Sequence, residues 1–423
     1  MIRYAHKETG LQERIDQFEK LYKTKEPRIH AFLPEAGRFA RLQREAGALD
    51  RNLGKLANHS PLFGLLLGVK DIFHVDGFPT QAGSRLPARV LRGAEATSVT
   101  LLKKTGMLIA GKTVTTEFAY FSPGPTRNPH NLAHTPGGSS SGSAAAVAAG
   151  LVDLALGTQT IGSTNRPASY CGVAGFKPSL GRISTAGVIP LAKSLDHVGL
   201  FAHEVSLIAA AAALLCTLWQ SRADPAQKPY VAVPTGAYLE RASDEMRAHF
   251  ENVVEGLQAA GYAVIRLDPF FDLDEIVARH NLILAAEAAQ AHAALYESYR
   301  WLYHEQTAAL IESGFTITDK DLGTALADVL NLRRTLNTLM DLHGIDLWIS
   351  PAATGPAPKG LASTGNPIMN LPWTQVGFPT LGLPSGFNRD GLPLGIQLAA
   401  GFNRDEDLLA WGVGIEKALG GIS

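Results

Sequence analysis

The sequence is poor in cysteine, in long apolar runs and in net charge. Only Cys171 and Cys216 occur in 423 residues, which is too few for a disulfide framework and is typical of a reducing compartment. The longest apolar run, residues 207–219, is shorter than the roughly 20 residues that a membrane-spanning helix needs. The polar N-terminal segment has no apolar core like that of a signal peptide. We therefore expect a soluble, cytoplasmic protein without a membrane partner.

The charge balance excludes the usual signature of a nucleic-acid or anionic-lipid partner. Lys and Arg number 38 against 39 Asp and Glu, so the net charge is −1 and the isoelectric point is about 6.9. The 13 histidines and two cysteines form no cluster with metal-ligand spacing. The sequence thus predicts no metal, and we expect no other cofactor.

The hydrophobic pattern predicts one large α/β domain. Apolar residues make up 46% of the chain, which is enough for a large core. We expect strands near 65–73, 107–113, 151–158, 230–234, 262–268, 345–353 and 392–400. We expect helices within 10–50, at 96–105, 143–149, 206–220, 243–260, at 273–342 with a break near 313–318, and at 405–419. Residues 159–190 are rich in Gly, Ser, Thr and Pro and predict loops, and no repeat or linker divides the chain.

The segment PGGSSSGSAAAVAAG, residues 136–150, has the composition of a flexible linker but lies between two predicted buried elements. Its second half contains good helix formers and no charge, so a packed loop that opens a helix is the better interpretation. The segment lacks the P-loop pattern GxxxxGK[ST] and a strand-coupled GxGxxG, which argues against a phosphate cradle. A loop that presents serine hydroxyls for nucleophilic chemistry is the remaining functional hypothesis.

Three residues in separate segments could form such a nucleophilic site. Ser139 lies in the glycine–serine loop, and Ser163 follows a glycine in GTQTIGSTNRPASYCG, residues 157–172. Lys70 interrupts an apolar run, and burial would lower its pKa from about 10.4 so that the neutral amine could act as a base. Each residue alone has a simpler explanation, as a helix cap, a turn residue or a lysine that reaches the solvent. The hypothesis therefore depends on their combination.

That combination resembles the amidase signature family over most of the chain. The similar segments are PLFGLLLGVKDIFHVDGFPTQAGS (61–84), AGKTVTTEFAYF (110–121), residues 136–150, GTQTIGSTNRPASYCGVAGFKPSLGRIS (157–184), SLDHVG (194–199), STGNPIMNLPWTQVGFPTLGLPSG (363–386) and GLPLGIQLAA (391–400). The resemblance implies a single domain, 1–423, with a central mixed β-sheet flanked by helices on both faces. It implies an N-terminal helical segment near 1–55, a signature core near 60–200, a variable and mostly helical substrate-side region near 205–340, and a return to the sheet near 345–423.

The resemblance also implies the catalytic groups. Ser163 matches the family's nucleophile, Ser139 the middle serine with its cis peptide bond, and Lys70 the base. The oxyanion hole would be formed by the backbone N–H groups of Thr160, Ile161, Gly162 and Ser163. The implied reaction is hydrolysis of an amide, or of a carbamate or urea-like substrate, through an acyl-enzyme on Ser163.

The signature departs from its usual form, which is close to GTDTGGSIRxPA, at three positions. Gln159 stands in place of an aspartate, Ile161 in place of a glycine, and the arginine falls one place later, at Arg166. Ile161 still provides a backbone N–H group, although its bulk could narrow the site. For Arg166 we expect a structural ion pair or hydrogen bond.

The substrate and the assembly are less well specified. Pocket-lining candidates are Phe118, Ala119, Tyr120 and Trp373, and the resemblance implies a homodimer that acts on a small molecule. Two other functions share these motifs. One is the glutaminase subunit of a tRNA-dependent amidotransferase, and the other is a non-catalytic binding protein with the same fold.

Overall fold

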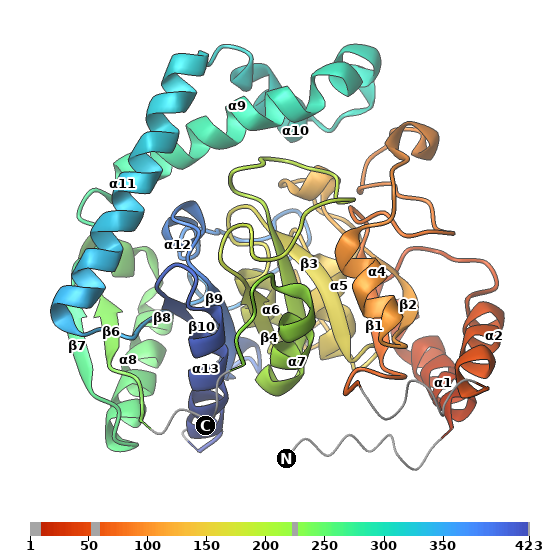
Figure 1. Cartoon of the computed structure of the whole chain (residues 1–423), viewed down its shortest axis with the longest axis horizontal. Coiled ribbons are helices and arrows are strands. Elements are labelled where there is room, and N and C mark those ends of the chain that lie inside the picture. Colours follow the sequence, from red (N-terminus) through yellow and green to blue (C-terminus); the bar gives the residue numbers. More distant parts are fainter. Residues whose placement is uncertain (1–9, 52–59, 222–226, 422–423) are drawn as a thin grey trace.

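The computed structural model describes residues 10–51, 60–221 and 227–421 (Figure 1). Residues 1–9 and 52–55 of the predicted N-terminal helical segment lie outside the described residues. Helices α1 (Leu11–Ile29) and α2 (Arg38–Asp50) lie in the remainder of that segment. No helix in the described ranges combines the length and the apolar character needed to cross a bilayer.

The described strands form one sheet in the order β2-β1-β3-β5-β4-β9-β10-β8-β6-β7. Strands β1, β2 and β3 pair in parallel, as do β6, β7 and β8, whereas the pairs that involve β5, β9 or β10 are antiparallel. The predicted α/β domain with a mixed sheet is therefore confirmed. The strands are β1 (Leu66–Lys70), β2 (Leu108–Thr113), β3 (Leu154–Gln159), β4 (Ala174–Lys177), β5 (His197–Ala202), β6 (Val231–Pro234), β7 (Val264–Leu267), β8 (Leu347–Pro351), β9 (Thr380–Phe387) and β10 (Pro393–Ala400).

Helices cover both faces of this sheet. Side chains on a strand alternate between the two faces of the sheet, so the contacts of two successive residues show what covers each face. On β9, Leu381 packs against Gly412 of α13, whereas Gly382 lies against Asn165 of α6. The further helices are α4 (Thr97–Lys104), α5 (Ser141–Ala148), α6 (Asn165–Cys171), α7 (Val205–Leu215), α8 (Asp244–Ala259), α9 (Leu273–Tyr299), α10 (Glu305–Gly314), α11 (Asp319–His343), α12 (Leu371–Gln375) and α13 (Asp405–Leu419), with 3₁₀ turns at Ala88–Leu91, Glu117–Ala119, Gly236–Arg241 and Arg300–Leu302.

The region 273–342 forms a helical arm with the predicted break between α10 and α11. Figure 1 shows α9, α10 and α11 arching over one end of the sheet, while α1 and α2 lie at the opposite side of the molecule. Helix α9 contacts α12, α11 and α10, so the arm is packed against the end of the sheet where α12 lies.

The glycine–serine–alanine segment is a packed helix start and not a linker. Residues 141–147 of α5 are buried. A Cβ added to Gly142 would lie 2.2 Å from the carbonyl oxygen of Ala31 and 2.3 Å from the backbone nitrogen of Val114. Only a residue without a side chain allows this close approach of two backbones, so the small residues here serve packing.

The prediction of loops throughout residues 159–190 is wrong in part. Helix α6 and strand β4 lie inside this range, and strands β5 and β9 also lacked a sequence prediction. The three strands contain glycines where they approach α6 or Thr164, the residue that precedes it. A Cβ on Gly175 of β4 would lie 2.6 Å from Ala168 Cβ, and one on Gly199 of β5 would lie 2.2 Å from Thr164 Oγ1. Composition thus predicted turns where small residues permit close packing of a helix on a sheet.

Candidate active site

The end of β1 and the segment before α5 bring the predicted lysine next to the predicted middle serine. Lys70 ends β1 and Gln159 ends β3, so both C-terminal ends lie at one edge of the sheet. Lys70 Nζ lies 2.7 Å from Ser139 Oγ and 2.7 Å from Thr158 Oγ1. The lysine side chain is 0% exposed, and this burial lowers its pKa well below the ordinary value, with a smaller opposing effect from Asp196. A neutral amine in contact with a hydroxyl can accept its proton.

Ser139 follows a cis peptide bond from Gly138 and begins the turn into α5. Its backbone oxygen accepts a hydrogen bond from Thr116 N–H at 3.2 Å. Gly137 has φ +82°, and a Cβ there would lie 2.9 Å from Pro167 Cα. A Cβ on Gly138 would lie 2.6 Å from Thr364 Cγ2. The two glycines therefore allow the backbone before Ser139 to lie directly against α6 and the loop at Thr364.

Ser163 lies in the turn between β3 and α6, and its side chain is 6% exposed. Within the described part of the chain, its hydroxyl makes no hydrogen bond, so the structure shows no bond between Ser163 and Ser139. The backbone N–H groups of Ile161, Gly162 and Ser163 likewise have no acceptor among the described residues. A Cβ on Gly162 would lie 2.3 Å from Asn370 Oδ1, which fixes a glycine at this position. An oxyanion hole requires N–H donors that are free in this way.

Gln159, the first departure from the usual signature, organises this turn. Its Oε1 atom accepts hydrogen bonds from the N–H groups of Thr164 at 2.8 Å and Asn165 at 3.0 Å, at the start of α6. Its Nε2 atom donates to Thr374 Oγ1 at 2.9 Å. Thr374 Oγ1 in turn donates to the Ile161 carbonyl at 2.7 Å. A neutral amide therefore holds both ends of the turn, since it accepts from one side and donates to the other.

The two other departures also have structural roles. The Ile161 side chain is 8% exposed and packs in the main core. Arg166 is 2% exposed and makes hydrogen bonds to backbone carbonyls and to a threonine, which agrees with the expected structural hydrogen bond. No ion pair of Arg166 occurs in the described ranges.

Asp196 is a polar group near the site that sequence reasoning did not single out, although it belongs to the quoted segment SLDHVG. Its carboxylate accepts hydrogen bonds from Thr160 Oγ1 at 2.6 Å, Leu191 N–H at 2.8 Å and Ala192 N–H at 3.0 Å. Burial raises its pKa to about 6, and these hydrogen bonds oppose that rise. Asp196 thus joins the first residue of the Ser163 turn to the loop at 191–192.

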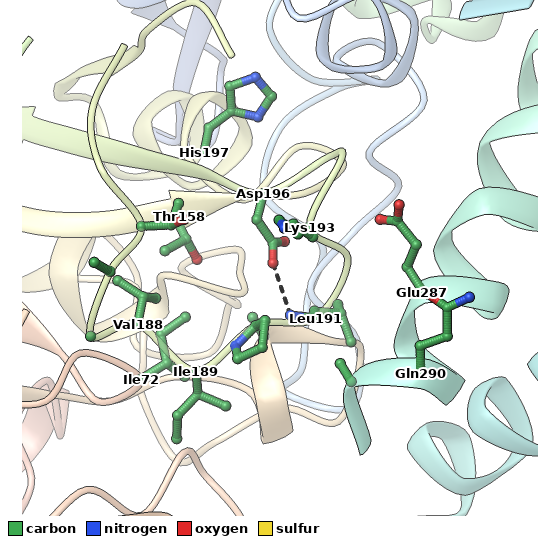
Figure 2. Close-up of a pocket in the computed structure, with 16 residues that line it drawn as sticks. Ile72, Thr158, Val188, Ile189, Leu191, Lys193, Asp196, His197, Glu287 and Gln290 are labelled. Atoms are coloured by element: carbon green, nitrogen blue, oxygen red, sulfur yellow. Dashed lines mark hydrogen bonds between the residues drawn. The ribbon is translucent and has the colours of Figure 1, made fainter. Parts of the chain in front are cut away.

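A cavity of about 540 Å³ adjoins this site at Asp196 and at Thr158, whose hydroxyl contacts Lys70 Nζ. Figure 2 shows Glu287 and Gln290 of α9 on one side of the lining residues and Val188 and Ile189 on the other. Glu287 accepts a hydrogen bond from Ser194 N–H at 2.8 Å. Ser139 and Ser163 are not among the lining residues. Those residues are Ile72, Ala119, Thr158, Thr185, Ala186, Gly187, Val188, Ile189, Pro190, Leu191, Lys193, Asp196, His197, Glu287, Gln290 and Ala291.

Of the four predicted pocket-lining residues, only Ala119 lines this cavity. Phe118 is 1% exposed and stacks on Tyr303, with ring centroids 5.2 Å apart. Tyr120 is half-buried and packs against Phe121.

Trp373 lies in the core, which contradicts the prediction that it lines the pocket. It is 0% exposed, and its Nε1 donates to Tyr238 Oη at 2.9 Å. Its ring also packs against the rings of Trp348, Phe270 and Phe378. The neighbouring Thr374, in the same LPWTQVG segment, is also a sequence candidate for lining the pocket or for packing, and the structure shows that it holds the Ser163 turn through the Ile161 carbonyl.

The cysteine, acidic and histidine side chains bear on disulfide formation and on metal binding. Cys171 and Cys216 are both buried and free. Among the described residues, no three His, Cys, Asp or Glu side chains gather where they could hold a metal ion.

Comparison with known proteins identifies relatives over nearly the whole chain. The family model for amidases matches residues 15–409. A glutamyl-tRNA(Gln) amidotransferase subunit from Synechococcus sp. (strain RCC307) is 30% identical over 91% of this chain and 89% of its own length. The corresponding protein from Geobacter metallireducens (strain ATCC 53774 / DSM 7210 / GS-15) is also 30% identical, over 88% of this chain and 86% of its own.

Solved structures agree with this result. A crystal structure of an amidase is 31% identical, has a TM-score of 0.85, and is matched over 97% of this chain and 96% of its own. A chain from a vestigial protein complex, described in work on the origins of an s-triazine catabolic enzyme, has a TM-score of 0.86 at 28% identity over 97% and 95% of the two chains.

Proposed function

The chain belongs to the amidase family and is a hydrolase of carbon–nitrogen bonds, and we propose that it cleaves a small amide, carbamate or urea-like substrate through an acyl-enzyme on Ser163. The observation that carries this proposal is the contact of 2.7 Å between Lys70 Nζ and Ser139 Oγ in a site closed to solvent. Burial lowers the pKa of the lysine and so favours its neutral form, and a neutral lysine is the base that serine chemistry needs.

In the proposed reaction, Lys70 takes the proton of Ser139, and Ser139 takes the proton of Ser163 as Ser163 Oγ attacks the substrate carbonyl. The N–H groups of the 160–163 turn donate to the developing oxyanion. The same protons return through Ser139 to the leaving amine, which is a poor leaving group unless it is protonated. Water then hydrolyses the ester on Ser163 and regenerates the free serine.

The cavity beside Thr158 supports a small-molecule substrate. Its volume of about 540 Å³ lies within the usual range for small-molecule sites. Its walls combine apolar groups such as Ile72 and Val188 with the polar side chains of Glu287 and Gln290. Such walls suit a substrate with an apolar body and a few hydrogen-bonding groups.

The test is to treat the purified chain with a serine-reactive fluorophosphonate and to map the adduct by mass spectrometry. We expect one adduct on Ser163 that is absent from Ser163→Ala and strongly reduced in Lys70→Ala. Amides, carbamates and ureas are then screened for turnover. An adduct on another serine, with Ser163 unmodified, would contradict the assignment. Labelling of wild type and Lys70→Ala at equal rates would contradict the proposal that Lys70 is the base.

The relatives named as amidotransferase subunits favour a second candidate function, release of ammonia from glutamine for a partner chain. Glutamine hydrolysis by the isolated chain, and its stimulation by added candidate partner subunits, separates this function from that of a free-standing amidase. The third candidate, a non-catalytic binding protein, predicts no labelling of Ser163. The homodimer and the cytoplasmic location stay predictions.

A further inference from the structure

Arg166 is a buried cation that the proposed reaction does not use. It lies in the first turn of α6, three residues after Ser163, and is 2% exposed. No carboxylate in the described ranges forms an ion pair with it. Burial lowers its pKa to about 10, so the guanidinium is charged at neutral pH. A buried charge without a counter-ion is costly, and hydrogen bonds offset that cost, so the partners of its two Nη atoms are informative. Its Nε atom is buried and has no hydrogen-bond partner in the described part of the chain.

The partners of Arg166 come from two loops that meet beside the site. Its Nη2 atom donates to the Gly138 carbonyl at 2.7 Å and to Thr364 Oγ1 at 3.1 Å, and its Nη1 atom donates to the Gly365 carbonyl at 2.6 Å. The Gly138 carbonyl belongs to the peptide group whose nitrogen is that of Ser139. Charge-assisted hydrogen bonds of this kind are stronger than neutral ones and restrict orientation because the guanidinium is planar.

Close packing around α6 supports this connection independently. A Cβ on Gly137 would lie 2.9 Å from Pro167 Cα and 3.0 Å from Tyr170 Cδ2. A Cβ on Gly365, which has φ +82°, would lie 2.4 Å from Tyr170 Oη. Both loops therefore lie in direct contact with the same face of α6 that presents Arg166. The helix that follows Ser163 is thus the surface on which the backbone before Ser139 is placed.

We propose that Arg166 is a positioning residue for the hydrolysis, which fixes the Gly138 carbonyl against α6 and thereby sets the position of Ser139 relative to Ser163. The inference rests on the proposed function, since it assigns a role within the same reaction. No hydrogen bond joins the two serines in the described residues, so their alignment depends on the backbones that carry them. Displacement of a reacting group by about 1 Å can reduce a rate about 10²-fold.

The test measures fluorophosphonate labelling of Ser163 in wild type, Arg166→Gln and Arg166→Lys. The maximal labelling rate and the fluorophosphonate concentration that gives half of this rate are determined separately. Arg182→Gln is the matched control, because Arg182 is also a nearly buried arginine, 9% exposed, that pairs with Glu406 away from the site. Thermal midpoints are recorded for all variants, and labelling is measured well below the lowest midpoint.

We expect Arg166→Gln to lower the maximal labelling rate at least about tenfold while the half-saturating concentration stays within about threefold. Arg166→Lys should recover part of the rate, since an ammonium can hold one carbonyl but not both. Arg182→Gln should lose stability without losing labelling rate. Labelling of Arg166→Gln at the wild-type rate, or an equal loss in Arg182→Gln, would overturn the proposal.

Two further comparisons keep the test decisive. If Arg166→Gln does not fold, Arg166→Lys and Thr364→Val are compared instead. Slower labelling of Arg166→Lys together with normal labelling of Thr364→Val supports the role of the Gly138 contact. Labelling of Arg166→Lys at the wild-type rate overturns that role. Failure of the proposed function is recognised separately, because wild-type Ser163 would then take up no adduct before any variant is compared.

Discussion

Lys70 Nζ and Ser139 Oγ lie 2.7 Å apart in a part of the protein where neither side chain is more than 1% exposed. A proton that moves between these atoms does not pass through water. Thr158 Oγ1, also 2.7 Å from the lysine nitrogen, fixes the direction of the amine. The protonation of Lys70 should therefore determine both the stability of the fold and the pH at which the site is competent.

Lys70 should make the free energy of unfolding increase with pH. Because burial lowers its pKa, the unfolded chain binds more protons than the folded chain between the folded-state pKa and the ordinary value near 10.4. The stability that Lys70 contributes is present above the unfolded-state value and is lost as the pH falls toward the folded-state pKa. The free energy of unfolding of wild type minus that of Lys70→Met, both measured in urea titrations, should thus rise from pH 7 to pH 10.

Lys104→Met is the control for this experiment, since Lys104 is an exposed lysine on α4. Its difference from wild type should stay nearly constant over the same pH range. A constant difference for Lys70→Met as well would mean that the buried lysine is charged in the folded protein.

Asp196→Asn should move the acid limb of the pH–rate profile to lower pH. The Asp196 carboxylate raises the pKa of Lys70 and opposes the effect of burial, so loss of its charge should lower that pKa further. The amide also replaces a carboxylate that accepts three hydrogen bonds, one of them from Thr160, so a fall of about tenfold in the plateau rate is expected. The measurement is kcat/KM, or the labelling rate, from pH 5 to pH 10. A limb that moves to higher pH would contradict this account of the charge.

Gly162→Ala should remove most activity because the Ser163 turn has no room for a side chain. The added Cβ would lie 2.3 Å from Asn370 Oδ1 and 2.9 Å from Pro367 Cβ, so the turn must shift. We expect a fall in kcat of at least about 10²-fold and a destabilisation of about 1–3 kcal/mol. Gly323→Ala is the matched control, since a Cβ there meets nothing within 4 Å on α11. That change should stabilise the protein by about 0.5–1 kcal/mol and leave kcat unchanged.

The sequence allowed the α/β class, most helices and strands, and the residues Lys70, Ser139 and Ser163 to be proposed, because each rests on local pattern or motif. Strands β4, β5 and β9 and helix α6 could not be predicted in the same way. The glycines of these strands and the small polar residues of α6 resemble loop composition, and the packing of α6 on the sheet explains them. Thr374 lies 213 residues from Ile161, and its hydrogen bond to that carbonyl cannot be inferred from spacing.

The contrasting places of Trp373 and Ala119 give a direct test of which predicted residue meets the substrate. Trp373→Phe removes core contacts and the hydrogen bond to Tyr238, so we expect a loss of about 1–3 kcal/mol in stability and little change in KM. Ala119→Met instead places a long, flexible side chain at the wall of the cavity. It should raise KM several-fold for the best substrate found, and because Ala119 is only 8% exposed the added volume should also cost about 1–3 kcal/mol of stability. A rise in KM for Trp373→Phe with normal kinetics for Ala119→Met would show that the substrate binds away from the Thr158 cavity.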